Sequence, residues 1–287
     1  KNCRTFKKIY RKESRCDMLN VTNNGINAPK KVFERPKTIQ ENYDYPFCAG
    51  CGHGVVLRLV AEVIDELGVQ GKTIAVASVG CSISMEKFYD LDIVGSSHGR
   101  APCVATGVKR AKPDKVVFTY QGDGDAATIG MNETIHTACR GENITTICIN
   151  NTNFGMTGGQ ASATSILGQK TTTTKQGRDP QKNGYPVKIA EMVALCDGAV
   201  YVERTGIYNP QSILKTKAAI KKGFLNQLNG LGFSFIEVLC ACPTGWKLNP
   251  VDSMAYIQNE IAKVHKIGVL KDITKQDAAQ NIYNKEL

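Results

Sequence analysis

From Cys48 onward, the sequence alternates segments of helical periodicity with short apolar runs rich in β-branched residues. Residues 53–67 repeat apolar side chains three and four positions apart, which predicts a helix with one apolar face. The pattern then predicts, in chain order, strand 73–79, helix 101–111, strand 115–120, helix 126–140, strand 144–149, helix 186–196, strand 199–203, helix 210–228 and strand 233–239. Because parallel strands need long crossover connections, which helices usually provide, we expect an α/β fold: a mainly parallel sheet with helices on both faces.

The composition suits one large globular domain. Of 287 residues 42% are hydrophobic, so the chain can bury a substantial core. We expect this domain at residues 42–265, between a basic extension (1–41) that is poorly ordered or partner-bound and a C-terminal tail (266–287). Neither a membrane-spanning run nor a signal peptide is recognisable, so we expect no membrane association and a cytoplasmic location.

The net charge of +10 is concentrated near the N-terminus. Residues 1–41 hold 11 Lys or Arg against 4 Asp or Glu, and the rest of the chain is nearly neutral. One alternative is a metal-binding interaction protein that uses this segment on nucleic acid. The segment lacks interleaved aromatic residues, so we expect no nucleic-acid partner. An organelle-targeting segment is another alternative.

A glycine-rich turn follows the predicted strand 115–120. It has the sequence Gly-Asp-Gly-Asp at 122–125 and precedes a predicted helix. The first turn of a helix favours an anion, and glycine lets a phosphate approach the backbone closely. The next strand ends in Asn-Asn, with Asn151 lying 28 positions after Asp123. The two side chains therefore emerge from neighbouring strands at one edge of the sheet. A carboxylate and an amide oxygen in this position suit a Mg²⁺ ion that bridges to a diphosphate.

Eleven cysteines at irregular spacing, without a secretion signal, favour a metal or cluster site over disulfides. Cys48 and Cys51 form a Cys-x-x-Cys pair, and Cys81, Cys240 and Cys242 follow predicted strands, so they could meet at the same sheet edge. The other cysteines have simpler interpretations. We expect core positions for Cys103, Cys139, Cys148 and Cys196, and no partner for Cys3 and Cys16 in the extension.

Six motifs in a fixed order give the chain a resemblance to a known family. They are Cys-x-x-Cys-Gly-His, Gly-Cys-Ser, His-Gly-Arg, Gly-Asp-Gly-Asp, Asn-Asn and Thr-Gly-Gly-Gln. From about Tyr45 to Pro250, the chain resembles the thiamine diphosphate-binding β subunit of 2-oxoacid:ferredoxin oxidoreductases, of the 2-oxoisovalerate or 2-oxoglutarate type. The resemblance implies the thiamine diphosphate-binding fold of the diphosphate-binding domain, with thiamine diphosphate, Mg²⁺ and a 4Fe-4S cluster as cofactors.

The resemblance also implies roles for individual residues. Mg²⁺ would be held by Asp123, Asn151 and the carbonyl of Asn153. The cluster would be held by Cys48, Cys51, Cys81 and Cys242; Cys240 departs from the usual pattern, and the proline after Cys242 favours Cys242 as the fourth ligand. Thiamine diphosphate would contact Gly80, Ser82, Gly122, Asp123, Gly124, Asp125, Asn151, Thr157 and Gly158. His98 and Arg100 would be the catalytic residues.

The implied reaction is oxidative decarboxylation of a 2-oxoacid to acyl-CoA and CO₂, with electrons passing through the cluster to ferredoxin. The glutamate that activates the thiamine belongs to a pyrimidine-binding domain, for which one α/β domain has no room. We therefore expect an α subunit as partner, with γ and ferredoxin-like δ subunits as further candidates, besides coenzyme A, ferredoxin and the 2-oxoacid. The alternative is a subunit of a non-redox thiamine diphosphate-dependent decarboxylase or synthase, which would not need the four cysteines.

The expected pocket walls indicate the kind of substrate. Segments 82–86 and 154–157 contain no Lys or Arg, and Lys87 and Arg100 are the nearest basic residues. The apolar side chains of these segments are Ile83, Met85, Phe154 and Met156. Because a second substrate carboxylate would need a cationic partner, we expect a branched or aromatic 2-oxoacid such as 2-oxoisovalerate.

Overall fold

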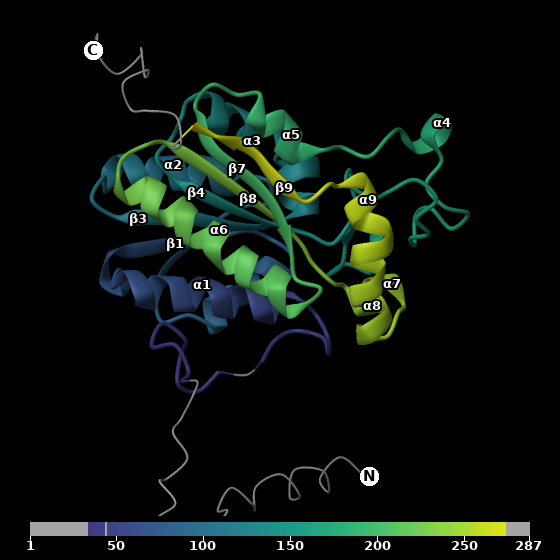
Figure 1. Ribbon diagram of the computed structural model, residues 1–287, viewed down its shortest axis with the longest axis horizontal. Helices are drawn as coiled ribbons and strands as arrows, with labels where there is room; N and C mark the ends of the chain where they lie inside the picture. The colour runs from purple at the N-terminus through teal and green to yellow at the C-terminus, as the bar shows by residue number, and fades with distance from the viewer. Residues whose placement is uncertain (1–33, 44, 274–287) are drawn as a thin grey trace, which may run out of the picture. The chain divides into compact units, whose positions relative to one another are not determined.

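The computed structural model describes residues 34–43 and 45–273. The chain divides after Glu34, and the compact unit that begins at Arg35 contains a seven-stranded sheet of order β2-β1-β3-β4-β8-β7-β9 (Figure 1). Its strands are β1 (Thr73–Ala77), β2 (Asp92–Gly95), β3 (Val116–Gly122), β4 (Thr145–Asn150), β7 (Ala199–Gly206), β8 (Phe233–Leu239) and β9 (Gly268–Asp272). All neighbours pair in parallel except β9, which is antiparallel to β7. The predicted α/β fold with a mainly parallel sheet is confirmed.

Helices cover both faces of the sheet (Figure 1). One face packs against α1 (His53–Leu67) and α6 (Pro210–Leu228), and the other against α2 (Ala101–Ala111), α3 (Met131–Cys139) and α5 (Ile189–Ala194). The remaining helices are short: η2 (Gln70–Lys72), η3 (Cys81–Lys87), η4 (Gly124–Ile129), α4 (Pro180–Asn183), α7 (Pro243–Trp246), α8 (Pro250–Tyr256), η5 (Ile257–Ile261) and α9 (Ala262–Val264). A separate two-stranded sheet pairs β5 (Asn153–Phe154) with β6 (Gln160–Ala161).

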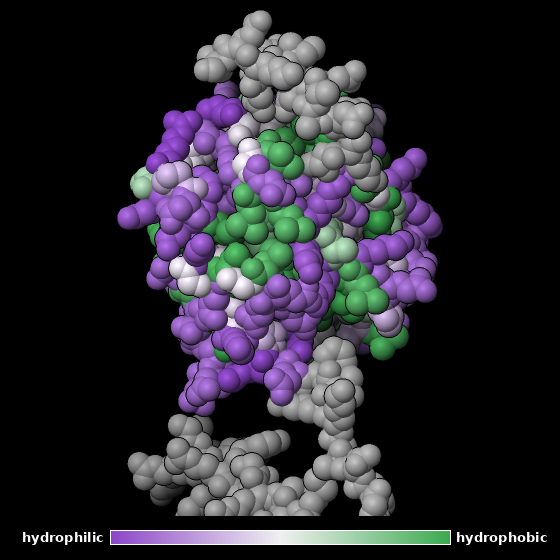
Figure 2. Space-filling view, turned by 60° about the vertical axis from the view of Figure 1, so that its left-hand side comes forward, coloured by the Kyte–Doolittle hydropathy of each residue, from purple (hydrophilic) through white to green (hydrophobic). Residues whose placement is uncertain are grey.

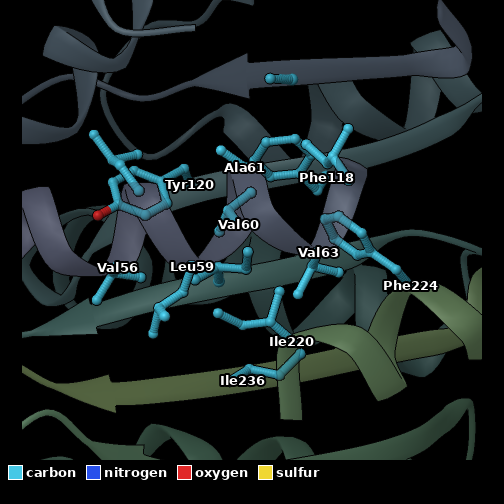
Figure 3. Close-up of a cluster of buried hydrophobic side chains, with 14 of the residues drawn as sticks. Val56, Leu59, Val60, Ala61, Val63, Phe118, Tyr120, Ile220, Phe224 and Ile236 are labelled. Atoms are coloured by element: carbon cyan, nitrogen blue, oxygen red, sulfur yellow. The ribbon is translucent and has the colours of Figure 1, made fainter. Parts of the chain in front are cut away.

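Alternate residues of the central strands build the two cores. Phe118 and Tyr120 of β3 pack against α1 and α6, as Figure 3 shows, whereas Val117 between them belongs to the core on the opposite face. All three side chains are fully buried. Successive side chains of a strand point to opposite faces, so a strand covered on both sides is apolar throughout. This is why the continuous apolar runs in the sequence predicted the central strands.

Several elements differ from the sequence prediction. The helix expected at 126–140 is divided into η4 and α3 at Gly130, where a Cβ would lie 2.3 Å from the main-chain oxygen of Gly99. Strands β2 and β9 were not predicted. Both lie at sheet edges, where β2 is mostly exposed and β9 is mostly half-buried, so they lack the continuous apolar run of a central strand.

The packed part of the chain extends beyond residues 42–265 at both ends. Thr38 and Ile39 are buried, Ile39 forms a β-bridge with Tyr89, and the Thr38 hydroxyl donates to Asp65 at 2.5 Å. At the other end, β9 completes the sheet. Most of the predicted basic extension, including Cys3 and Cys16, and the tail after residue 273 lie outside the described residues.

The surface includes apolar as well as polar regions. No helix within the described ranges has the length and apolar character required to cross a bilayer. Leu195, Leu214 and Val251 are 85%, 67% and 78% exposed, which is high for large apolar side chains. Figure 2 shows apolar residues gathered in the middle of one face and bordered by hydrophilic residues.

Candidate active site

The strand register brings the motif segments to one edge of the sheet. Ala77 of β1 is level with Tyr120 of β3, and Asn150 of β4 is level with Leu239 of β8. The segments that follow these strands therefore emerge together, at the carboxyl edge where ligands of open α/β sheets bind. Segments 78–82, 122–125, 150–157 and 240–242 meet there.

A cavity of about 90 Å³ opens at this edge. Its lining includes most of the predicted site residues, namely Gly80, Ser82, His98, Gly122, Asp123, Gly124, Asp125, Asn151, Asn153 and Thr157. Two glycines leave space for different reasons. A Cβ at Gly122 would meet no atom within 4 Å, whereas a Cβ at Gly124 would lie 2.3 Å from the ring of Phe154. Gly122 therefore leaves free space for a ligand, and Gly124 lets Phe154 pack over the start of η4.

Asp123 is a buried carboxylate held at the end of β3. Its Oδ2 accepts hydrogen bonds from the hydroxyls of Ser162 and Thr164, both at 2.5 Å. Burial raises the pKa of Asp123 to about 6, although these two donors oppose the rise. The second oxygen, Oδ1, faces Asn151. A buried carboxylate with one oxygen still available is suited to a cation.

A strained turn at Thr152 brings oxygens of Asn151 and Asn153 together. Thr152 has φ of 56°, which costs a β-branched residue on the order of 1 kcal/mol or more. The turn is fixed by hydrogen bonds: Ser165 Oγ donates to the Thr152 carbonyl at 2.5 Å, and Gln169 Nε2 donates to the Thr152 hydroxyl at 2.9 Å. The loop after β6 thus supports both sides of the site.

One end of the Asn151 side-chain amide faces three oxygens. It lies 3.0 Å from Asp123 Oδ1, 2.7 Å from the Asn153 carbonyl and 3.1 Å from Asn153 Oδ1. An amide oxygen at that end would place four oxygens around one point. An octahedral Mg²⁺ has adjacent ligand oxygens about 3.0 Å apart, since each Mg–O bond is about 2.1 Å. The donor set and its spacing therefore fit Mg²⁺.

His98 is oriented by Asp125. Asp125 Oδ1 accepts hydrogen bonds from His98 Nδ1 at 2.6 Å and from the Gly99 amide at 2.7 Å, and its Oδ2 accepts one from Gln121 Nε2 at 2.5 Å. Asp125 is buried, whereas the side chain of His98 is half-buried and lines the cavity. With Nδ1 engaged, the remaining ring nitrogen of His98 is available to a ligand.

Four cysteines line a second cavity of about 280 Å³ next to the first. They are Cys48 and Cys51 before α1, Cys81 after β1, and Cys242 after β8. Burial raises the pKa of the Cys51 thiol to about 12, and the proximity of Cys242, Cys81 and Cys48 adds to the rise. Four neighbouring thiolates therefore need a positively charged group between them, which the iron of a cluster provides.

The cysteine arrangement is too open for a single ion. Within residues 34–43 and 45–273, no group of three or more His, Cys, Asp or Glu side chains could hold one metal ion. A four-iron cluster sets its ligand sulfurs farther apart than one ion does, so the arrangement remains compatible with a cluster. Cys240 is absent from the described lining of this cavity: it is fully buried in the apolar core beneath Gly52, where a Cβ would lie 2.4 Å from its sulfur.

Comparison with known proteins identifies the family. Residues 76–238 match the family described as "Thiamine pyrophosphate enzyme, C-terminal TPP binding domain". The 2-oxoglutarate synthase subunit KorB of Methanocaldococcus jannaschii is 35% identical over 244 residues, which cover 83% of this chain and 85% of KorB. The chain belongs to the thiamine diphosphate-binding β subunits of 2-oxoacid:ferredoxin oxidoreductases.

Other members of the family extend the comparison. A solved structure of 2-oxoglutarate:ferredoxin oxidoreductase from Magnetococcus marinus, with 2-oxoglutarate, coenzyme A and succinyl-CoA bound, superimposes with a TM-score of 0.68 at 26% identity, covering 85% of this chain and 87% of that one. The ketoisovalerate oxidoreductase subunit VorA of Methanothermobacter marburgensis is 38% identical over 252 residues, covering 85% of this chain. The chain spans 53% of the length of that subunit.

Some predicted residues of this β subunit lie away from the cavities. Arg100 caps the start of α2, and its guanidinium pairs with Glu133 of α3, so the structure does not bring it to the cavity lining. Gly158 lies beyond Thr157 and is not part of that lining. Met85, expected on a pocket wall, is fully buried in the core against α1. Phe154 and Met156 do line the first cavity.

The cysteines outside the second cavity differ in burial. Cys148 and Cys196 are buried, as predicted. The core prediction was wrong for Cys103 and Cys139, which are exposed. Both lie on amphipathic helices, α2 and α3, where a cysteine can occupy the solvent-facing side as readily as the apolar one.

Sequence reasoning missed the residues that hold the predicted ligands in place. Ser162 and Thr164 support Asp123, and Gln121 supports Asp125. Arg178 is buried and donates to the carbonyls of Ser162 and Ser165, which ties the long loop together. The only sequence signal was the richness of residues 155–184 in Ser, Thr and Gln.

Proposed function

We propose that the chain is the part of a 2-oxoacid:ferredoxin oxidoreductase that binds thiamine diphosphate through Mg²⁺ and a 4Fe-4S cluster beside it. The reaction would convert a 2-oxoacid and coenzyme A to acyl-CoA and CO₂, and pass two electrons through the cluster to ferredoxin. One observation carries the proposal: the cysteine cavity and the diphosphate cavity adjoin. Their linings share His53, Cys81, Asn151, Gly155 and Met156.

The chain's own residues would hold both cofactors. Thiamine diphosphate, when bound, supplies the chemistry that cleaves the bond between the carboxylate and the carbonyl carbon. Mg²⁺ would be bound by Asp123, Asn151 and the Asn153 carbonyl, with Gly122 leaving room for the diphosphate. The cluster would be bound by Cys48, Cys51, Cys81 and Cys242, with Cys242 rather than Cys240 because Cys240 faces the core.

His53 is placed at the boundary between the two sites. It is 2% exposed, and its Nδ1 lies 3.0 Å from the hydroxyl of Tyr120. Burial lowers its pKa to about 4, so the ring is neutral at physiological pH. A neutral, packed aromatic layer of His53 and Phe47, whose rings stack 5.3 Å apart, would exclude water between the cofactors.

The exposed residues of the chain indicate where electrons would leave and where a partner would bind. Cys48 is exposed, so a cluster bound there lies near the surface, where a ferredoxin could accept electrons. Within the described chain we assign no glutamate to activation of the thiamine, and we propose that a pyrimidine-domain α subunit supplies it. The exposed apolar residues on the surface would suit such a partner (Figure 2).

Reconstitution tests the proposed function. The chain would be coexpressed anaerobically with its pyrimidine-domain partner and assayed for reduction of ferredoxin by a 2-oxoacid. We expect reduction that depends on thiamine diphosphate and coenzyme A. Decarboxylation that proceeds without any electron transfer would instead support the non-redox decarboxylase or synthase.

We predict that the complex prefers 2-oxoisovalerate to 2-oxoglutarate. Neither cavity has a Lys or Arg among its described lining residues, and an unpaired, desolvated carboxylate would cost several kcal/mol. Phe154 and Met156 offer apolar contacts instead. Competition between the two acids would measure the ratio of kcat/KM values. A higher kcat/KM for 2-oxoglutarate would show that the preference is wrong.

We predict that His98→Ala lowers kcat by roughly 100-fold, the usual contribution of a positioned acid or base. Asp125→Asn should also lower kcat, because an amide cannot accept all three hydrogen bonds that Asp125 receives, one of which orients His98. His136→Ala is the matched control, since His136 is an exposed histidine of α3. Steady-state kinetics of the reconstituted complex is the measurement, and a wild-type kcat in His98→Ala would remove this residue from the reaction.

A further inference from the structure

Asn153 has a side-chain amide that the described protein does not satisfy. The residue is 3% exposed, and its Nδ2 has no hydrogen-bond partner among the described residues. Leaving a buried N–H group unpaired is unfavourable, because the group loses its hydrogen bonds to water without gaining others. The carbonyl and Oδ1 of the same residue both face the Asn151 side chain, on the side of the proposed Mg²⁺ position. The unpaired Nδ2 therefore points away from the proposed Mg²⁺ position.

The sulfur of Cys242 lies beside this amide. A Cβ on Gly245 would be 2.4 Å from Asn153 Nδ2 and 2.8 Å from Cys242 Sγ. A Cβ on Gly155 would be 3.0 Å from the same sulfur and 3.4 Å from Asn153 Oδ1. The Asn153 amide and the Cys242 sulfur therefore border the same two glycines, and a side chain at either glycine would crowd both groups.

We infer that Asn153 links the two cofactor sites: its carbonyl faces the cation that holds the diphosphate, and its side-chain N–H donates to the cluster sulfur of Cys242. The inference deepens the proposed function and rests on it. A hydrogen bond to a ligand sulfur favours the more negative, reduced cluster, so it raises the reduction potential. Asn153 would make the cluster a better acceptor for electrons that leave the substrate beside it.

Two substitutions test this link. Asn153→Asp keeps the size and the main-chain carbonyl but replaces the donor with a carboxylate, and Asn153→Ala removes the side chain. In an EPR-monitored redox titration of the holo complex, we expect the cluster potential to become more negative in both variants, and more so in Asn153→Asp. Asn132→Asp, on an exposed position of α3, is the matched control for the added charge and should leave the potential unchanged.

The outcomes separate the inference from the proposed function. A wild-type potential in both Asn153 variants, each with its cluster present, would overturn the inference alone. A wild-type complex that contains no iron and gives no EPR signal would overturn the proposed function, and the inference with it.

Discussion

Asp123→Ala and Asn151→Ala are each expected to abolish Mg²⁺-dependent binding of thiamine diphosphate. Each substitution removes an oxygen from the proposed Mg²⁺ site, in which three oxygens of Asp123 and Asn153 lie 2.7 to 3.1 Å from one end of the Asn151 amide. Loss of an outer-sphere partner alone weakens metal binding roughly 10- to 100-fold, so loss of a direct ligand should exceed that. Isothermal titration calorimetry with thiamine diphosphate and Mg²⁺ measures the affinity.

The fold should survive these changes. Asp123 is a buried carboxylate whose pKa is raised, so removing it relieves an unfavourable charge while freeing two hydroxyls. The matched control is Asp114→Ala, because Asp114 is an exposed aspartate just before β3, at the opposite end of that strand from Asp123. Control affinity should equal wild type. Unchanged cofactor affinity in both Asp123→Ala and Asn151→Ala would refute the metal assignment.

Changing Cys48, Cys51, Cys81 or Cys242 to serine is expected to eliminate the 4Fe-4S cluster. The four sulfurs border one cavity, and each iron of the cluster needs its own thiolate. The measurement is the content of iron and sulfide per chain after anaerobic purification, together with the broad visible absorption of the cluster.

Two other cysteines serve as controls. Cys240→Ala should keep the cluster, because its sulfur packs in the core against Gly52 and Ile207. Cys103→Ser should also keep it, because Cys103 is exposed on α2. A cluster that survives Cys242→Ser but is lost in Cys240→Ala would reverse the choice of fourth ligand.

The sequence predicted best those strands that are buried on both faces of the sheet. The central strands β3, β4 and β8 are apolar because helices cover both of their sides, and α6 was predicted with its exact bounds at 210–228. Edge strands β2 and β9 were missed, since solvent on one side removes the apolar run. The break at Gly130 depends on the distant Gly99 backbone, which local periodicity does not encode.

The sequence predicted the positions of those site residues that directly follow a strand. Asp123 and Asn151 were expected at one sheet edge, and the parallel register places them there. Sequence could not show that Arg100 pairs with Glu133 away from the lining of the first cavity, because this is a tertiary contact between α2 and α3. The strain at Thr152 and its support by Ser165 also depend on the folded loop, although they determine where the neighbouring asparagines point.

We propose above all that this chain holds thiamine diphosphate beside a cluster that accepts the substrate's electrons. Low-temperature EPR of the anaerobic reconstituted complex tests it most directly, by comparing samples with and without a 2-oxoacid. We predict that a reduced-cluster signal appears on adding 2-oxoisovalerate and thiamine diphosphate, and that Asp123→Ala shows this signal only with dithionite. The account would be contradicted if dithionite reduced the wild-type cluster but no 2-oxoacid did.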